Sequence, residues 1–119
     1  MLDFNKYQKE AHETASYPSG MIGDTNFGSR VGYIYPAMGL SEEAGEVAGK
    51  FAKAVRDNNG IIDDERKEAI KKELGDVLWF IAELCTVLNI PMEEVAQKNL
   101  EKLASRKARG VIHGSGDDR

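Results

Sequence analysis

Apolar residues recur every three or four positions through most of the chain, which is the spacing of one face of a helix. The first such run follows Asp3, a residue suited to capping a helix N-terminus, and extends to about Ala15. A second run begins near Ala37, directly after Pro36, and stops at the turn residues 57–60. The N-terminal half is therefore predicted to hold two helices.

Two further apolar runs fill the C-terminal half. The longer run follows a capping residue, Asp63 or Asp64, and is predicted to extend to Asn89. The last run begins at Pro91, which the first turn of a helix tolerates, and ends at Gly110, a common C-terminal cap. Since no segment alternates as a strand does, the pattern predicts an all-α fold of four helices.

The predicted helices form a single domain, residues 1–119, with two parts outside them. Residues 16–36 are rich in glycine and aromatic side chains and are predicted to form a long loop. Loops of this length are usually functional lids or disordered segments, and the sequence leaves both open. Residues 111–119 are too short and too polar to add a core element, so we expect a flexible tail.

A short acidic motif occurs twice along the chain. Residues 43–47 read Glu-Ala-Gly-Glu-Val, and residues 73–77 read Glu-Leu-Gly-Asp-Val. Each residue of a helix turns about 100°, so carboxylates three positions apart lie about 60° from each other and share a face. If the apolar sides of these two helices pack together, both acid pairs reach the edge of one seam. The expected seam residues are Ala44, Val47, Phe51, Leu74, Val77 and Ile81.

Four carboxylates that face one another repel strongly unless a cation neutralises them. The oxygen ligands of Glu43, Glu46, Glu73 and Asp76 suit hard cations, so the motif predicts a Mg²⁺ site that Mn²⁺ could also fill. The competing interpretation is that these acids are solvated, as is typical of the exposed face of an amphipathic helix.

Three nearby residues favour the metal site. Each acid pair brackets a glycine, Gly45 in the first motif and Gly75 in the second. A glycine inside a helix costs roughly 0.5–1 kcal/mol relative to alanine, so we expect both to permit a close approach of the helices. Glu42 adds a fifth acid, about 40° around the helix from Glu46.

Cationic residues near the acids could contact phosphate oxygens. Lys50 and Lys53 continue the flank of the first acid pair, although an ordinary Glu46–Lys50 ion pair is the preferred interpretation of Lys50. A polar stripe on the last predicted helix is either solvated or phosphate-binding. Its members are Asn99, Lys102, Arg106 and Arg109.

Aromatic, histidine and cysteine residues add less. Trp79 and Phe80 adjoin the second acid pair and could stack on a nucleobase, but core packing is the preferred interpretation of both. His12 and His113 lack the Glu-x-x-His spacing of di-iron bundles, so redox iron chemistry is disfavoured. Cys85 is the only cysteine and lies on an apolar helix face, which predicts a core thiol.

Composition limits the class of protein. Hydrophobic residues make up 41% and charged residues 30%, which suits a folded helical chain and not a disordered one. The formal net charge is −4, so no basic footprint for a nucleic-acid polymer is present. The apolar runs are too short to span a membrane and the N-terminus lacks a signal-peptide pattern, so we expect a cytoplasmic protein without a membrane partner.

The two acidic motifs resemble those of the MazG-like family of all-α nucleoside triphosphate pyrophosphohydrolases, over about residues 39–109. The family's pattern is Glu-x-x-Glu followed by Glu-x-x-Asp, here Glu43, Glu46, Glu73 and Asp76. The last predicted helix is similar to the family's phosphate-binding element through Asn99, Lys102 and Arg106. The resemblance implies a four-helix MazG-like domain that dimerises into helical bundles, as a homodimer or homotetramer.

The resemblance also implies a reaction. It is hydrolysis of a nucleoside triphosphate, NTP or dNTP, between the α- and β-phosphates to a monophosphate and pyrophosphate, in nucleotide-pool control. Metal held by the four acids would bind the triphosphate and activate a water, which Glu42 or Glu43 could orient or deprotonate. The residues expected to contact substrate are Lys53, Trp79, Asn99, Lys102 and Arg106.

Two alternatives stay open from the sequence. A phosphoribosyl-ATP pyrophosphohydrolase, or a dUTP- or dCTP-selective enzyme, would use the same acids with a different base pocket. A non-catalytic helical interaction module would instead keep its acids solvated or use them to hold a structural magnesium ion.

Overall fold

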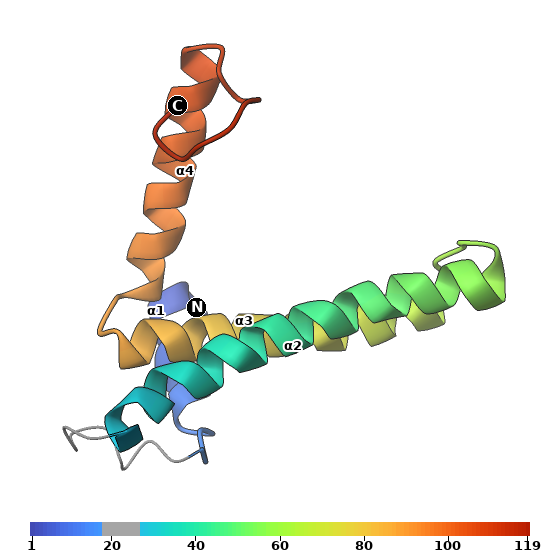
Figure 1. Ribbon diagram of the computed structural model, residues 1–119, viewed down its shortest axis with the longest axis horizontal. Helices are drawn as coiled ribbons and strands as arrows, with labels where there is room; N and C mark the ends of the chain where they lie inside the picture. Colours follow the sequence, from blue (N-terminus) through green and yellow to red (C-terminus); the bar gives the residue numbers. More distant parts are fainter. Residues whose placement is uncertain (18–26) are drawn as a thin grey trace.

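The computed structural model describes residues 1–17 and 27–119, with the side chains of 27–33 left aside. Four helices make up the described fold, and none of the described residues forms a strand (Figure 1). This confirms the predicted all-α fold, while assembly into dimers stays a prediction. The helices are α1 (Phe4–His12), α2 (Phe27–Asn58), α3 (Asp64–Val87) and α4 (Met92–Ala108).

Local chemistry sets most helix ends where the sequence predicts them. The carboxylate of Asp3 accepts a hydrogen bond from the Lys6 amide at 2.7 Å, and that of Asp63 accepts one from the Arg66 amide at 2.9 Å. Asn59 and Gly60 end α2 with φ angles of 54° and 75°, in the left-handed region where helices commonly stop. The first helix ends three residues before the predicted Ala15, and the third ends two residues before the predicted Asn89.

The start of α2 differs from the prediction. The helix begins at Phe27 and not near Ala37, so residues 27–36 of the predicted 16–36 loop are helical, and residues 18–26 lie outside the described residues. Pro36 lies inside α2 and its side chain is fully buried. Proline removes one helical hydrogen bond, and burial of its ring offsets that loss.

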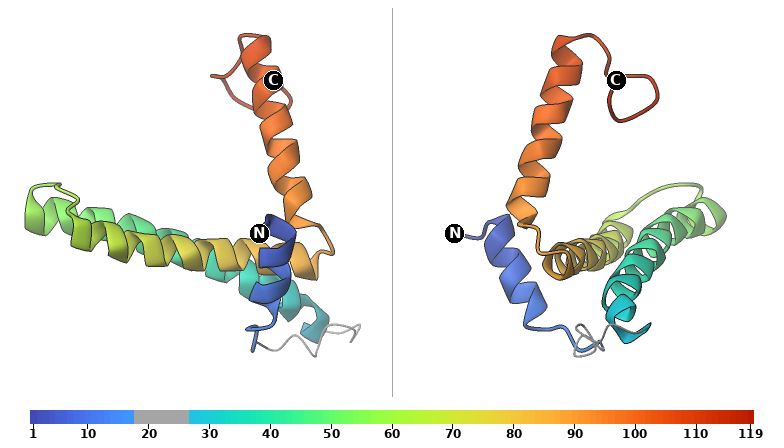
Figure 2. Two further views of the ribbon diagram at one scale, coloured as in Figure 1. Left: turned by 180° about the vertical axis from the view of Figure 1, so that it is seen from behind. Right: turned by 60° about the vertical axis from the view of Figure 1, so that its left-hand side comes forward.

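The helices α2 and α3 lie side by side and antiparallel, joined by a short turn, and form a long hairpin (Figures 1 and 2). Helix α1 packs across the C-terminal half of α3. The chain then bends by 106° between α3 and α4, so that α4 projects away from the hairpin (Figure 2). The hairpin and the projecting α4 therefore form two arms that meet near α1.

The core is small and lies where these arms meet. Ala11, Ala82, Cys85 and Met92 are buried there, and partly buried apolar side chains pack around them: Tyr7, Leu78, Trp79 and Ile81. Burial raises the pKa of the Cys85 thiol, which agrees with the predicted core role of that cysteine.

A buried carboxylate connects α1 to this core. Glu83 is 0% exposed, and both of its oxygens lie near Nδ1 of His12, at 3.1 and 3.3 Å. The Tyr17 hydroxyl donates to the same carboxylate at 2.7 Å, and the Tyr17 ring stacks on Tyr35 of α2 at a centroid distance of 5.0 Å. Hydrogen bonding at this depth replaces the water that a buried acid loses.

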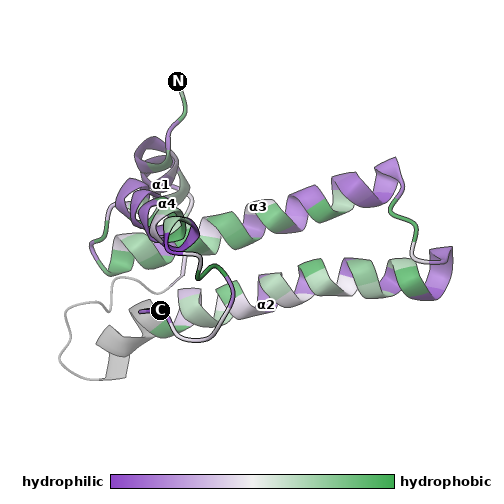
Figure 3. Cartoon of the chain, turned by 90° about the horizontal axis from the view of Figure 1, so that it is seen from above, coloured by the Kyte–Doolittle hydropathy of each residue, from purple (hydrophilic) through white to green (hydrophobic). Residues whose placement is uncertain are grey.

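The seam between α2 and α3 is narrower than predicted. Ala54 and Ile70 are buried, but Phe51 and Leu74 are 47% and 52% exposed and Ala44 is exposed too, so the predicted place of these three residues inside the seam is wrong for the single chain. Only a narrow line of each helix faces the other in a two-helix hairpin. Hydrophobic and hydrophilic residues alternate along both helices (Figure 3). Several large apolar side chains of these helices are exposed.

The expected close approach at the motif glycines is also wrong. A Cβ atom built at Gly45 or Gly75 would meet no atom within 4 Å, because both glycines lie on exposed sides of their helices. The helices approach each other instead at Gly39, where a Cβ would lie 2.2 Å from the Phe80 ring. Gly39 is therefore the position at which the hairpin requires the absence of a side chain.

The first turn of α4 is capped by side chains from α1. Pro91 supplies no side-chain cap, and the amides of Met92 and Glu93 instead donate to Gln8 at 2.8 Å and to Asn5 at 3.1 Å. The Glu93 carboxylate in turn accepts from the Phe4 amide at 3.2 Å. These bonds satisfy amides that a helix N-terminus leaves without partners.

Across the described residues, each helix taken singly is too short or too polar to cross a membrane. The bent pair α3 and α4 meets the length and composition criteria only when both helices are counted together.

Candidate metal centre

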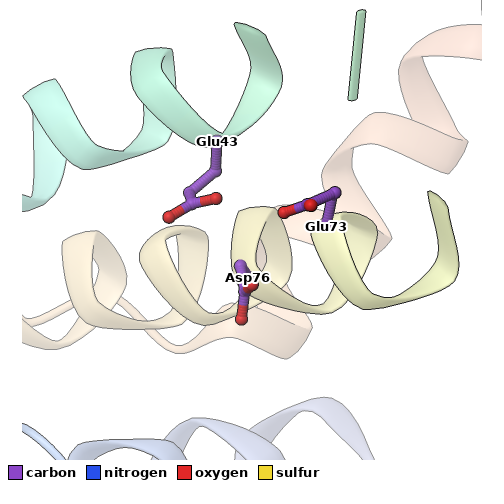
Figure 4. A group of neighbouring side chains, drawn as sticks. All are labelled: Glu43, Glu73 and Asp76. Carbon is purple, nitrogen blue, oxygen red and sulfur yellow. The ribbon is translucent and has the colours of Figure 1, made fainter. Parts of the chain in front are cut away.

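Three carboxylates from the two acidic motifs meet between α2 and α3. Glu43 extends from α2 toward α3, which carries Glu73 and Asp76 one turn apart (Figure 4). One carboxylate oxygen from each residue lies within 4.8 Å of the others. Glu43 and Glu73 are partly buried and Asp76 is exposed, so the group is open to solvent on one side. The helical period thus brings the two motifs together as their spacing predicts.

The fourth acid of the motifs and the neighbouring Glu42 lie just outside this group. Glu46, the fourth predicted ligand, and Glu42 are both exposed on α2. Both carboxylates are near enough to Glu43 to influence its charge. A cation bound among the three clustered acids would therefore have a fourth and fifth carboxylate nearby.

The electrostatics of the cluster favour a positive ligand. Partial burial raises the pKa of Glu43 above its ordinary value, and the negative charges of Asp76, Glu42, Glu73 and Glu46 raise it further, in decreasing order of effect. A carboxylate in this position is harder to ionise than a free one. Binding of a cation would reverse that effect and hold Glu43 in its charged form.

One lysine already offsets part of this negative charge. The Lys50 ammonium lies 2.9 Å from a Glu73 oxygen, and this contact raises the pKa of Lys50. The preferred prediction of an ordinary Glu46–Lys50 pair is wrong, because Lys50 reaches across the seam to α3. The sequence gives no signal for this pairing, which depends on how the two helices are placed side by side.

A tyrosine of α1 is a second neighbour that the sequence does not reveal. Burial raises the pKa of the Tyr7 phenol, and the charge of Asp76 raises it further. Tyr7 reaches this position because α1 packs on α3, a tertiary contact with no motif of its own.

All three clustered residues offer carboxylate oxygens, the donors that Mg²⁺ and Mn²⁺ prefer. The geometry therefore fits a hard divalent cation better than zinc or copper.

Trp79 lies one turn beyond Asp76 and holds α1 against α3. Its indole Nε1 donates to the carbonyl of Ala11 at 3.2 Å and to the hydroxyl of Thr14 at 2.8 Å. Its ring packs edge-on against the Phe80 ring, at a centroid distance of 5.0 Å. These contacts favour a packing role, and stacking of Trp79 on a base stays a prediction.

The predicted phosphate-binding residues lie away from the three clustered acids. Lys53 is exposed on α2, ten positions or about 15 Å of helix beyond Glu43. Two residues of the stripe on α4, Asn99 and Lys102, line an open hollow of about 660 Å³ between α4 and the rest of the chain. That hollow is lined by Phe4, Leu78, Ile81, Val95, Asn99 and Lys102, among others.

Within one chain, none of the three clustered acids lines this hollow. Leu78 and Ile81 lie about 140–200° around α3 from Asp76, by the helical period. Arg106, farther along the stripe, is 5% exposed beneath the C-terminal residues. The stripe and the acids of one chain therefore do not form a single cleft.

Comparison with known proteins agrees with this geometry. The MazG nucleotide pyrophosphohydrolase domain matches residues 37–111, which include both acidic motifs. The Gene 37 protein of Mycobacterium phage L5 is 48% identical over 113 residues, 95% of this chain and 96% of that protein. The uncharacterized protein YvdC of Bacillus subtilis (strain 168) is 31% identical over 117 residues, 89% of this chain and 94% of that protein.

No solved structure matches this chain. The domain match covers more than half of the chain and includes the paired carboxylates that meet between α2 and α3. The chain belongs to the MazG nucleotide pyrophosphohydrolase family.

Proposed function

We propose that this protein hydrolyses nucleoside triphosphates, NTP or dNTP, between the α- and β-phosphates, releasing a monophosphate and pyrophosphate. The observation that carries the proposal is the convergence of Glu43, Glu73 and Asp76 within 4.8 Å in a chain of the MazG family. Nucleotide-pool control in the cytoplasm is the role we expect for such an activity.

The proposed metal ligands are Glu43, Glu46, Glu73 and Asp76, with Mg²⁺ as the cation and Mn²⁺ as a substitute. A bound divalent ion would neutralise these acids, hold the triphosphate oxygens and lower the pKa of an attacking water. Glu46 is exposed on the same helix as Glu43, and its charge is near enough to raise the pKa of Glu43. Lys50 must exchange its contact with Glu73 when a cation enters, and its ammonium is then free to meet a phosphate oxygen.

A proton acceptor for the attacking water is also available. Glu42 is exposed beside the cluster and lies outside the three-carboxylate group. It can therefore accept a proton while the other acids hold the metal. Glu43 is the second candidate, because burial and its acidic neighbours raise its affinity for a proton. We assign the two residues to orienting or deprotonating the water.

The remaining contacts to substrate are assigned to Lys53, Trp79, Asn99, Lys102 and Arg106. We propose that a second copy of the chain completes this set, in a homodimer or homotetramer. Within one chain, none of the three clustered acids lines the hollow that Asn99 and Lys102 of the stripe line. Large apolar side chains stay uncovered on both arms, which favours their burial by another subunit. Examples are Phe51, Val55 and Leu74 on the hairpin and Val95, Leu100 and Leu103 on α4.

The proposal is tested by incubating the protein with a panel of canonical and modified NTPs and dNTPs, with Mg²⁺ or Mn²⁺, and resolving the products by anion-exchange chromatography. We expect a monophosphate and pyrophosphate as the first products. Initial release of orthophosphate would place the cleaved bond elsewhere. Absence of turnover for the whole panel, phosphoribosyl-ATP, dUTP and dCTP included, would favour a non-catalytic helical module.

The matched variants separate the site from general effects of charge. Glu73→Gln should abolish most turnover while the helical circular dichroism is kept. Glu68→Gln removes the same charge from an exposed position on α3 and should leave turnover unchanged.

A further inference from the structure

The C-terminal residues fold back along the last turns of α4 (Figures 1 and 2). Gly110, Gly114 and Gly116 have φ angles of 69°, 130° and 84°, which are conformations that side chains rarely adopt, and they let the chain reverse. The Val111 amide donates to the Arg106 carbonyl at 2.9 Å. Arg119 closes the loop by donating to the carbonyls of Ile112 and Gly116. We call residues 110–119 the C-terminal loop.

An acid of this loop occupies the cationic stripe of α4. One Asp117 carboxylate oxygen lies 3.4 Å from the Lys102 ammonium and 3.3 Å from Nη2 of Arg106. The same Nη2 donates to the main-chain carbonyls of Asp117 at 2.5 Å and Gly116 at 3.3 Å. Two of the cations assigned to substrate phosphates therefore already hold an anion supplied by the chain itself.

Asp117 uses only part of the hydrogen-bond donors of the Arg106 guanidinium. The Arg106 side chain is 7% exposed, and its Nε has no hydrogen-bond partner among the described residues. A guanidinium binds a phosphate best through two parallel bonds, from Nε and one Nη. Asp117 contacts only Nη2, so a buried donor is left for an external anion.

We propose that Asp117 is an intramolecular competitor, which a polyphosphate must displace from Lys102 and Arg106 before the stripe can bind it. The proposal rests on the phosphate-binding role proposed for this stripe. The Asp117 side chain is 83% exposed, and ion pairs with an exposed partner are weak. A polyphosphate offers several charged oxygens to the same donors, so exchange favours it.

The competitor is charged under physiological conditions. Lys102 and then Arg106 hold the pKa of Asp117 below its ordinary range, so the carboxylate is ionised at neutral pH. Asp117 therefore meets Lys102 and Arg106 as a charged group in the absence of a polyphosphate.

The test measures binding of inorganic pyrophosphate by isothermal titration calorimetry in metal-free buffer, with no turnover involved. Asp117→Asn keeps the loop carbonyls but removes the competing charge, and should bind pyrophosphate about 2–5-fold more tightly, the range of an exposed ion pair. Asp118→Asn is the control, since its carboxylate makes no ion pair among the described residues, and it should bind as the wild type does. Arg106→Ala should lose binding.

Hydrogen exchange supplies a second readout on the same full-length proteins. Adding pyrophosphate to the wild type should speed exchange of the Val111 amide and of the loop amides after it. Equal or weaker pyrophosphate binding by Asp117→Asn, or loop exchange that pyrophosphate does not change, would overturn the competitor. Because no nucleotide is hydrolysed here, a tighter Asp117→Asn complex would uphold the loop mechanism even if the product analysis refuted the proposed reaction.

Discussion

Replacing Glu43 by glutamine separates a metal site from a set of structural ion pairs. Glu43 shares its place with Glu73 and Asp76, within 4.8 Å, and its pKa is raised by partial burial and by these acids. Removing its charge should therefore stabilise the metal-free protein. The same change should remove a ligand and weaken stabilisation by Mg²⁺. Ion pairs that supported the fold would respond in the opposite sense.

The size of the effect comes from the geometry. Two unit charges about 5 Å apart repel by about 1 kcal/mol in water and by about 3 kcal/mol at an effective dielectric constant of about 20. Asp76 is exposed and Lys50 offsets Glu73, so the lower figure applies. For a domain of this size, about 1 kcal/mol corresponds to about 4 °C in Tm. Mg²⁺ at about 100 times its Kd would add about 2.7 kcal/mol to the wild type, or about 10 °C.

The assay is thermal unfolding followed by circular dichroism, at one fixed protein concentration, first with EDTA and then with Mg²⁺. We expect Glu43→Gln to unfold about 4 °C higher than the wild type with EDTA and to lose most of the rise with Mg²⁺. Glu68→Gln should differ little from the wild type in both buffers. A Glu43→Gln protein that melts several degrees lower with EDTA, or keeps the full Mg²⁺ shift, would refute the cluster.

Three further results are expected. Because the folded pKa of Glu43 lies above its ordinary 4.5, the stability that this group contributes is present below pH 4.5 and is lost as the pH rises through the raised pKa. The Tm advantage of metal-free Glu43→Gln over the wild type should therefore widen from pH 4.5 to 7, and a constant Tm difference would contradict the pKa shift. Lys50→Met removes the ammonium that lies 2.9 Å from Glu73, so calorimetry should show several-fold tighter Mg²⁺ binding, while the stability of the metal-free protein falls. Weaker Mg²⁺ binding would mean that Lys50 does not compete with the metal. Gly39→Ala forces a Cβ against the Phe80 ring and should lower the free energy of unfolding by about 1–3 kcal/mol, measured with denaturant. Gly45→Ala should instead raise it by about 0.5–1 kcal/mol, and a destabilised Gly45→Ala protein would indicate that another subunit packs on that glycine.

Features set by neighbours in the sequence were predictable. Asp3 and Asp63 cap helices through amides only three residues away, so the residue type alone identifies the position. The two acidic motifs meet because the helical period fixes which side chains share a face. The all-α fold and the three clustered acids could thus be derived before any coordinates.

Features set by tertiary packing were not predictable. Pro36 and the glycines before it suggest a break, yet burial of Pro36 keeps α2 helical through that point. The Lys50–Glu73 pair and the effect of Asp76 on Tyr7 depend on how α1, α2 and α3 are placed together. Phe51 and Leu74 stay exposed because two packed helices bury only a narrow strip of each other's surface.

The caps that α1 gives to α4 bear on where the domain can be cut. The family match begins at residue 37 and leaves α1 out. A fragment limited to residues 37–111 would lose the Asn5 and Gln8 side chains that hold the first amides of α4, and with them Ala11 of the core. A fragment limited by sequence similarity should therefore be less stable than one that keeps the α1 residues.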